Sequence, residues 1–347
     1  MKDRAAYTFR LTTLAVCCLF VFTASFFIGR YGIDFLTVLK ILADRFVRLV
    51  SFGKFGLKQT WTSAQQSIVV NIRLPRIAAA ALVGASLATA GAAYQGMFRN
   101  PMVSPDILGA STGAGFGAAL AILFGFSYSG ITTLSFVFGM AAVLIAWLVS
   151  KSSRIQTTIA MVLAGVMVSS LFSAGTSFVK LVADTQSQLP AITYWLMGSL
   201  SSIKSADLHF AAIPILVGLV PLFLLRWRIN LLTVSEAEAR SMGIETGRLR
   251  LLVIICATLM TSASVSVSGM IGWVGLAIPH FCRLIFGQDY RRLIPCSALM
   301  GAVFLMLVDN ISRTISTAEI PLGILTAFIG APVFLYLIIT GGSARND

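Results

Sequence analysis

The sequence has few charged residues and almost no histidine. Of its 347 residues, 11% are charged and two are histidines, whereas 57% are hydrophobic. It contains no Ser/His/Asp cluster, no pair of carboxylates within an apolar run, and no G-x-x-x-x-G-K-S/T phosphate loop. The chain therefore lacks the groups that hydrolytic chemistry and ATP binding require, and we predict no catalytic residue, no cofactor and no bound metal.

Cysteine is also scarce, and acidic residues are half as frequent as basic ones. The basic residues number 26 and the acidic residues 13, which gives a net charge of +13. They are scattered among segment ends and form no patch with interleaved aromatics, so we predict cytoplasmic loops rather than nucleic-acid binding. The five cysteines lack metal-ligand spacing and are typical of small buried hydrophobes: Cys17, Cys18, Cys256, Cys282 and Cys296.

Apolar runs long enough to cross a membrane, which takes about 20 residues, fill most of the chain. The run 251–286 would be roughly 54 Å long as one helix, against a hydrocarbon core of about 30 Å. It must therefore turn back, and Gly269 and Gly272 mark the corner. Because so many spans follow, the N-terminal run is predicted to be a first span and not a cleaved signal. We predict ten spans with both termini on one side, at about 11–29, 77–98, 107–126, 131–149, 158–180, 208–225, 251–268, 270–286, 292–309 and 321–340.

The distribution of basic residues predicts the orientation of these spans. Outside the segment 30–76, most basic residues fall on the side of the N-terminus, which the positive-inside rule places in the cytoplasm. The segment 30–76 would then be external, and residues 33–46 within it form an amphipathic pattern with Asp44 turned away from the apolar face. We expect this helix to lie on the membrane surface or, more simply, to pack on the spans. Its apolar face would consist of Phe35, Leu36, Leu39, Leu42 and Phe46, with Lys40 and Arg45 away from it.

Two stretches depart from the long apolar runs. The segment 97–109, MFRNPMVSPDILG, contains two prolines that break a helix at a membrane edge. The segment 233–243, TVSEAEARSMG, predicts a short water-exposed helix on the inner side, with Ser235 as N-cap and Gly243 as C-terminal stop. This short helix is either a solvated loop element or a surface that another protein grips.

Five stretches in a fixed order give the sequence a specific resemblance over about residues 68–340. It resembles the FecCD/BtuC family, the permease subunits of bacterial ABC importers for iron–siderophore complexes, haem, vitamin B12 and, in some members, molybdate. The stretches are RLPR (73–76), FRNP followed by DILGASTGAGFG (98–101 and 106–117), SEAEARSMGI (235–244), GWVGLAIPHFCR (272–283) and EIPLGILTAFIGAPVFLYLI (319–338).

The resemblance implies an all-α polytopic membrane protein of about ten transmembrane helices, a BtuC-like type II importer permease. Residues 1–347 would form one permease domain, in the inner (cytoplasmic) membrane of a bacterium. It would form a homodimer with the substrate path along the interface. Two separate ABC ATPase subunits would bind the cytoplasmic face, and a periplasmic or lipid-anchored binding protein would dock outside. ATP would then be hydrolysed on another chain, so this chain would not itself be an enzyme.

The resemblance also implies which residues contact the binding protein. Arg73 and Arg76 match the outward-facing arginines of the RLPR motif, which in the family meet acidic residues of the binding protein. Arg313 corresponds to a third arginine, although it precedes Glu319 by six residues where seven are expected. The alternative is that Arg73 and Arg76 only anchor the end of a span at the membrane interface.

Two further sites follow from the resemblance, both on the cytoplasmic side. The region 229–246 would contain the coupling helix, which sits in a cleft of the ATPase and transmits its closure to the spans. Thr157 and Thr158, just before the fifth span, would form the cytoplasmic gate, where small hydroxyls narrow a pore without binding cargo tightly. The coupling contacts would be Glu236, Ala237, Ala239, Arg240 and Gly243.

The cargo expected from the resemblance is a metal chelate, with an iron(III)–siderophore as the first expectation. Haem, cobalamin and molybdate stay open, because the external binding protein selects the substrate. An ion-coupled secondary transporter would instead need an acidic residue in mid-membrane, and the acidic residues fall near predicted span ends. An integral-membrane enzyme would need clustered polar catalytic groups, which the sequence does not contain.

Overall fold

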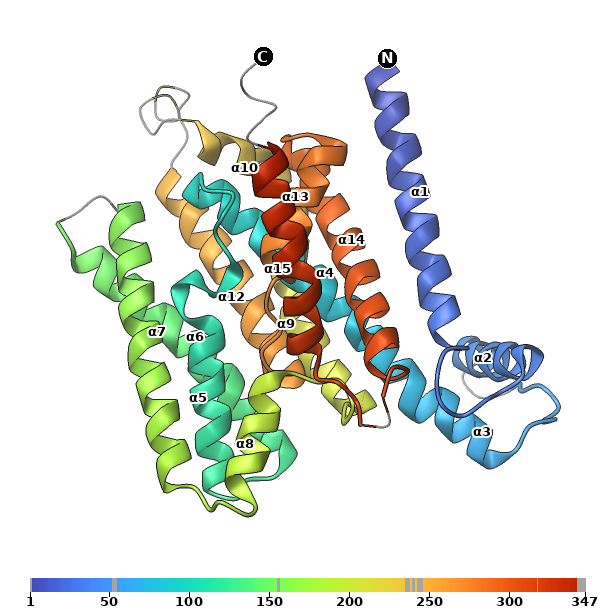
Figure 1. Ribbon diagram of the computed structural model, residues 1–347. Coiled ribbons are helices and arrows are strands. Elements are labelled where there is room, and N and C mark those ends of the chain that lie inside the picture. Colours follow the sequence, from blue (N-terminus) through green and yellow to red (C-terminus); the bar gives the residue numbers. More distant parts are fainter. Residues whose placement is uncertain are drawn as a thin grey trace.

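The computed structural model in Figure 1 is a bundle of helices. It describes residues 2–51, 55–154, 157–234, 238, 241, 246–316 and 318–341, and these ranges contain no strand. The helices are α1 (Lys2–Ser25), α2 (Phe35–Val50), α3 (Ser63–Ser67), the π-helical turn η1 (Ile68–Arg73), α4 (Leu74–Phe98), the 3₁₀ turn η2 (Pro105–Leu108), α5 (Ala110–Leu123), α6 (Tyr128–Ser152), α7 (Thr157–Val182), α8 (Gln188–Met197), α9 (Ser205–Leu224), α10 (Arg226–Thr233), α12 (Thr246–Ser268), α13 (Val274–Phe286), α14 (Tyr290–Ser312) and α15 (Leu322–Gly341).

Ten apolar helices correspond to the ten predicted spans. Seven of them are long and apolar enough to cross a membrane, and three shorter ones, in α5, α13 and α15, complete the set among the described residues. The start of α1 and the end of α15 lie at the same end of the bundle, as predicted (Figure 1). Following the predicted orientation, we refer to this end as the inner end and to the opposite end as the outer end.

The short helices α5 and α13 each follow a corner in the backbone. Gly109 ends the turn η2 with a φ of 88°, and α5 begins at the next residue. Gly269 and Trp273 have φ values of 67° and 68° on either side of the bend between α12 and α13. These values lie in the left-handed region, where a regular helix cannot continue. The predicted corner is confirmed, and the predicted span at 107–126 is a 3₁₀ turn followed by a shorter helix.

The central helix is longer than the sequence predicted. The turns α3 and η1 continue into α4 as one 36-residue apolar helix, Ser63–Phe98, whereas the predicted span starts at 77. A capping box sets its start: the Gln65 N–H donates to Oγ1 of Thr62 at 3.2 Å, and the Thr62 N–H donates to Oε1 of Gln65 at 3.0 Å. Pro75 lies inside this continuous helix, directly after the π-helical turn, where the departure from the regular α-helical hydrogen-bond pattern accommodates its missing N–H.

Glycines bring α4 into backbone contact with its neighbours. Gly84 of α4 faces Gly301 of α14, and Gly91 of α4 faces Gly275 of α13. A Cβ atom on Gly84 or Gly91 would collide with the carbonyl oxygen of the facing glycine. Small residues allow this approach in a membrane protein, where packing rather than a hydrophobic driving force holds helices together. The close helix packing thus places α4 at the buried centre of the bundle.

The amphipathic helix predicted over 33–46 is α2, but its apolar face points away from the protein. Leu36 and Phe46 are 61% and 66% exposed. The buried side carries Val38, Ile41 and Asp44 instead. Of the predicted apolar face, Leu42 packs against the core and Phe35 stacks on Phe27, whereas the other three residues are exposed. The expectation that this face packs on the spans is therefore wrong for most of it, because α2 contacts the protein mainly through its opposite side.

Candidate functional site

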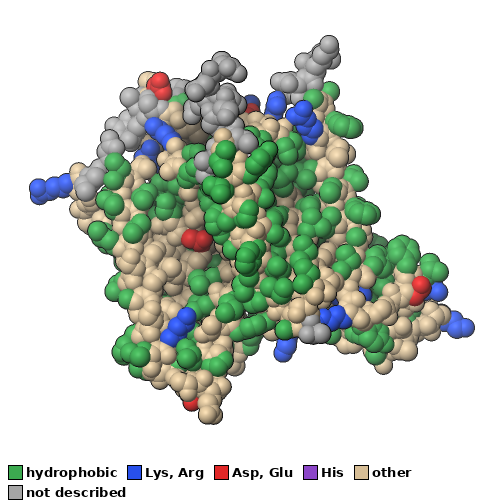
Figure 2. Space-filling view, in the orientation of Figure 1, with side chains coloured by type: hydrophobic (Ala, Val, Ile, Leu, Met, Phe, Trp, Pro, Cys, Tyr) green, Lys and Arg blue, Asp and Glu red, His purple; other side chains and the backbone are tan. Residues whose placement is uncertain are grey.

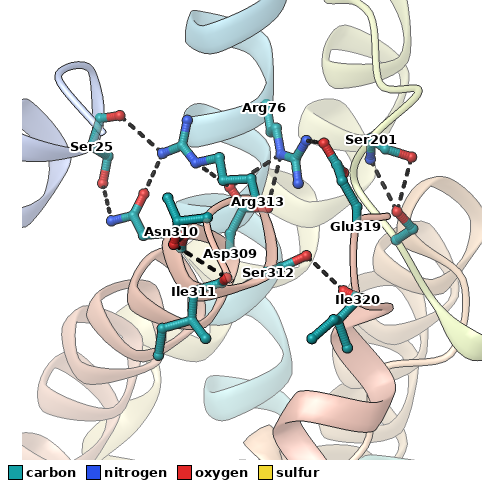
Figure 3. A network of polar contacts seen from close by, with 12 residues as sticks. Ser25, Arg76, Ser201, Asp309, Asn310, Ile311, Ser312, Arg313, Glu319 and Ile320 are labelled. Atoms are coloured by element: carbon teal, nitrogen blue, oxygen red, sulfur yellow. Dashed lines mark hydrogen bonds and ion pairs between the residues drawn. The ribbon is translucent and has the colours of Figure 1, made fainter. Parts of the chain in front are cut away.

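Four charged side chains form a cluster at the outer end, where α4, α14 and the connection between α14 and α15 meet (Figure 3). Nε of Arg76 donates to both carboxylate oxygens of Asp309, at 2.9 and 3.2 Å. Nη1 of Arg76 donates to Oε1 of Glu319 at 2.9 Å. The side chains of Arg76 and Asp309 are buried, whereas that of Glu319 is 26% exposed. One guanidinium therefore joins carboxylates from two other segments.

Arg313 completes this outer charge cluster from the other side of Asp309. Its Nε lies 3.7 Å from Oδ2 of Asp309, one helical turn earlier. Its Nη2 donates to the backbone oxygen of Ser25 at 2.9 Å and also to Oδ1 of Asn310. Burial lowers the pKa of Arg313 to about 10 while Asp309 raises it, so the guanidinium stays charged at neutral pH. Two positive and two negative groups thus neutralise one another in a site with little water.

Arg73 lies one turn before Arg76 and binds backbone oxygens. Its two Nη atoms donate to the carbonyl oxygens of Phe26 and Tyr31, each at 2.6 Å, which holds the turn after α1 against α4. Arg73, Arg76 and Arg313 are 4%, 6% and 6% exposed. The structure thus brings Arg76 and Arg313 together on one carboxylate and directs all three arginines at oxygens of their own chain. Their contact with a binding protein stays a prediction.

Sequence reasoning missed the role of Asp309 in this cluster. Asp309 precedes Arg313 by four residues, a spacing that places an acidic and a basic side chain on the same face of a helix. This spacing was the signal in the sequence that could have indicated the pair. Its pairing with Arg76 joins residues 233 positions apart and leaves no local signal. Within the described residues, Nη2 of Arg76 and Oε2 of Glu319 have no hydrogen-bond partner. The cluster therefore retains the capacity for a further polar contact.

At the inner end, the segment that leads into the coupling region is anchored. The Asn230 side chain of α10 donates to Oδ1 of Asp289 at 2.7 Å and accepts from the Tyr290 N–H at 2.9 Å. Nε of Arg99, the residue after α4, donates to the backbone oxygen of Leu232 at 2.9 Å. Thus α10 is tied to both α4 and α14. The predicted coupling contacts themselves lie outside the described residues: Glu236, Ala237, Ala239, Arg240 and Gly243.

One of the two predicted gate residues borders an internal space. Thr158, at the start of α7, lines a cavity of about 140 Å³. Residues of α4, α6 and α12 complete the lining, among them Phe98, Trp147 and Arg250. The side chain of Thr157 lies outside the described part of the chain. A gating role for the two threonines stays a prediction.

An apolar groove of about 620 Å³ lies along the first half of α15, between α8 and the bend that joins α12 to α13. Hydrophobic side chains are dense over α15 on the face that Figure 2 shows. Among the described residues that line the groove, none is charged, and Trp273 has the only side-chain hydrogen-bond donor. The lining consists of Leu196, Met197, Met270, Gly272, Trp273, Gly323, Ile324, Ala327, Phe328, Ala331 and Pro332.

Comparison with known proteins assigns the chain to a family. The sequence model of the FecCD transport family matches residues 17–340. The chain belongs to the FecCD transport family. It is 43% identical over 274 residues to a molybdate import system permease protein of Haemophilus influenzae, covering 79% of this chain and 81% of that relative. It is also 44% identical over 276 residues to a probable iron chelatin transport system permease protein of Helicobacter pylori, covering 80% and 83%.

A solved structure confirms the fold of this FecCD permease. A metal-chelate type ABC transporter in an inward-facing conformation matches 95% of this chain and 98% of its own, at 38% identity and a TM-score of 0.84. The all-helical, multi-pass architecture expected from the sequence is therefore confirmed. The outer charge cluster, the anchored α10 and the apolar groove all belong to a FecCD transport permease that spans the membrane.

Proposed function

We propose that this chain is the membrane subunit of an ATP-driven importer in the inner membrane of a bacterium, and that its cargo is a metal chelate. The apolar groove carries this proposal. A bound oxyanion such as molybdate needs several hydrogen-bond donors or positive charges, because burying an anion without them is costly. Among its described residues the groove offers one side-chain donor, on Trp273, beside ten other apolar residues and glycines. It suits the organic shell of a chelate, and we assign an iron(III)–siderophore as the first candidate.

In a dimer, a second copy of the chain would cover the open side of this groove and so form an enclosed path for the cargo. The groove is open along α15, where Phe328 and Leu335 are 76% and 59% exposed. In a homodimer related by two-fold symmetry, the same face of each subunit meets its counterpart. Two facing grooves would form an apolar channel between the subunits, with the binding protein at the outer end and the ATPase subunits at the inner end.

The region after α10 would couple this path to the ATPase. Because α10 is bonded to α4 and α14, a displacement that reaches α10 would be passed to both of these helices. The absence of a phosphate loop from the sequence supports ATP hydrolysis on a separate subunit. Small residues at Ala237, Ala239 and Gly243 would let the ATPase surface approach closely, and Glu236 and Arg240 would form ion pairs with it.

Replacing Gly243 with tryptophan, or Arg240 with glutamate, is expected to abolish most ATP-dependent transport. The first change blocks close approach and the second reverses a charge at the interface. Co-purification with the ATPase and uptake by proteoliposomes would both fall, while the melting temperature of the chain stays unchanged. Lys151→Glu, an exposed change at the inner end of α6, is the matched control. Normal ATPase association and uptake in both variants would remove the coupling role.

Replacing Glu319 with glutamine is expected to tighten the docking of the binding protein. The change removes a carboxylate that competes for Arg76 and makes the outer surface more positive. We expect a gain of about 0.5–1 kcal/mol, or roughly two- to five-fold in Kd, at low salt. Surface plasmon resonance on nanodisc-embedded chain would measure it. The gain should vanish in high salt, and weaker or unchanged binding at low salt would argue against docking through these arginines.

Uptake by proteoliposomes tests the proposal as a whole. They would contain this chain, the ATPase and the binding protein encoded beside it. Iron(III)–siderophore, haem, cobalamin and molybdate would be offered separately, with and without internal ATP. ATP-dependent accumulation of a chelate would support the proposal, and accumulation of molybdate alone would overturn the cargo assignment. Accumulation driven by an ion gradient without the ATPase would overturn the importer assignment.

A further inference from the structure

The helix α2 carries an apolar stripe that the described part of the chain leaves largely exposed, with Phe35 at its edge stacked on the ring of Phe27. At 3.6 residues per turn, its five apolar positions fall within an arc of about 100°, the width of an apolar face on an amphipathic helix. A surface of this kind would be unfavourable in water. The stripe consists of Phe35 (55% exposed), Leu36 (61%), Leu39 (44%), Phe46 (66%) and Val50 (62%).

The opposite side of α2 fixes the direction of this stripe. Val38 and Ile41 are 0% and 2% exposed. Asp44, on the same side, accepts from Nε of Arg48 and from the backbone N–H of Leu57, both at 2.7 Å. The Arg48 guanidinium holds the pKa of Asp44 below its usual value, so the carboxylate stays charged at neutral pH. Because α2 is held by the packing of this side and by the hydrogen bond from Leu57 to Asp44, the stripe points outward in the folded chain.

The position of α2 along the membrane normal follows from α1. The apolar span of α1, Ala5–Ser25, has 21 residues, and at about 1.5 Å per residue it matches a hydrocarbon core of about 30 Å. Directly after this span, Phe26 is buried and the Phe27 ring stacks on that of Phe35 at 4.6 Å between centroids. The helix α2 therefore lies beside the outer end of α1, and its axis runs across that of α1 (Figure 1). This is the depth at which hydrocarbon meets lipid headgroups.

The charges that border the stripe match a lipid surface. Lys40 and Arg45 are exposed and lie on either side of the apolar arc. Hydrophobic and basic side chains occur together over this part of the molecule in Figure 2. The stripe is also close to the exposed apolar surface of α1, where Leu19 and Phe20 are 64% and 69% exposed and face lipid if α1 spans the membrane. Basic side chains at the edge of such a surface extend toward lipid phosphates.

We propose that α2 is an interfacial helix that inserts its apolar stripe into the outer leaflet. Lys40 and Arg45 bind lipid phosphates at its two edges. Of the eight basic residues of segment 30–76, which run against the positive-inside pattern of the other segments, this assignment accounts for Lys40 and Arg45, because they bind headgroups rather than orient a span. It does not depend on the cargo or on the transport mechanism.

Spin-label accessibility in liposomes tests the proposal. Cys17 and Cys18 would be replaced by alanine, which leaves the three buried cysteines unlabelled. A nitroxide would then be attached at Leu39→Cys, on the stripe, or at Lys40→Cys, the adjacent control at its edge. We expect the label at position 39 to collide mainly with oxygen, which concentrates in lipid, and the label at position 40 to collide mainly with a water-soluble nickel chelate. Phe46→Cys repeats the test two turns along the same stripe.

Each other outcome would overturn the assignment to lipid. Preferential collision with the nickel chelate at positions 39 and 46 would place the stripe in water. Protection that appears only when the binding protein is added would make it a protein-docking surface. Spin–spin broadening between labels at position 39 would place it between two copies of the chain. Variants would be compared only after each elutes from size-exclusion chromatography like the parent protein.

Discussion

Replacing Asp309 with alanine is expected to destabilise the protein by about 3–5 kcal/mol, the usual result of removing one partner from a buried ion pair. The change would leave Arg76 and Arg313 buried, with Glu319 as the remaining acidic partner. Their mutual repulsion would separate the start of α4 from the end of α14. A thermal melt of detergent-solubilised protein, followed by size-exclusion chromatography, would show the loss as a lower midpoint and a lower yield.

The double variant Asp309→Ala with Arg76→Met provides the control for this prediction. It removes one charge of each sign, so Arg313 and Glu319 leave the cluster neutral. Because the methionine fills much of the space of the arginine stem, we expect the double variant to be more stable than Asp309→Ala alone. If the two losses were simply additive, Asp309 would act through packing and not through its charge.

Replacing Gly91 with valine is expected to have the second largest effect. The new side chain would meet the backbone of Gly275 in α13, which cannot move aside as a flexible side chain can. Overpacking of a dense core costs about 1–3 kcal/mol, and a collision with backbone belongs at the upper end of this range. The same thermal melt would show it, together with a loss of transport, because α13 borders the bend that lines the apolar groove.

Gly247→Ala is the matched control for the Gly91 variant. Gly247 also lies in a helix, α12, but a Cβ there would have no atom of the described residues within 4 Å. Alanine has a higher helix propensity than glycine by about 1 kcal/mol, so this variant should be as stable as the parent or more stable. Equal losses in the two variants would mean that the α4–α13 contact does not limit stability.

The apolar segments could be predicted from the sequence because each has a local signature. Run length identifies the spans, and Gly269 marks the corner because few other residues adopt its left-handed backbone. The extension of α4 could not be predicted, because Pro75 normally ends a helix. Here it lies inside a longer helix, directly after a π-helical turn that interrupts the regular hydrogen-bond pattern, and the Thr62 capping box sets the start of that helix.

The candidate sites were predicted less completely, for a physical reason. The resemblance selected Arg76 and Arg313, but the carboxylate that joins them is distant in sequence from Arg76 and is revealed only by the packing of α4 against α14. The apolar groove likewise combines α8, α15 and a bend, none of which contains a motif of its own. The outward direction of the α2 stripe depends on which side of the helix holds Asp44, and a hydrophobic pattern alone cannot determine that.

The continuous helix Ser63–Phe98 also has a mechanical consequence. Its 36 residues extend over roughly 54 Å, at 1.5 Å per residue. Arg76 with its two carboxylates lies 13 residues from the outer end of the helix, and Arg99 joins the inner end to α10. A hydrogen-bonded helix resists compression along its axis, so this helix connects the two faces of the membrane mechanically. We therefore expect a displacement of α10 to move Arg76 and the outer charge cluster together with the inner end of α4.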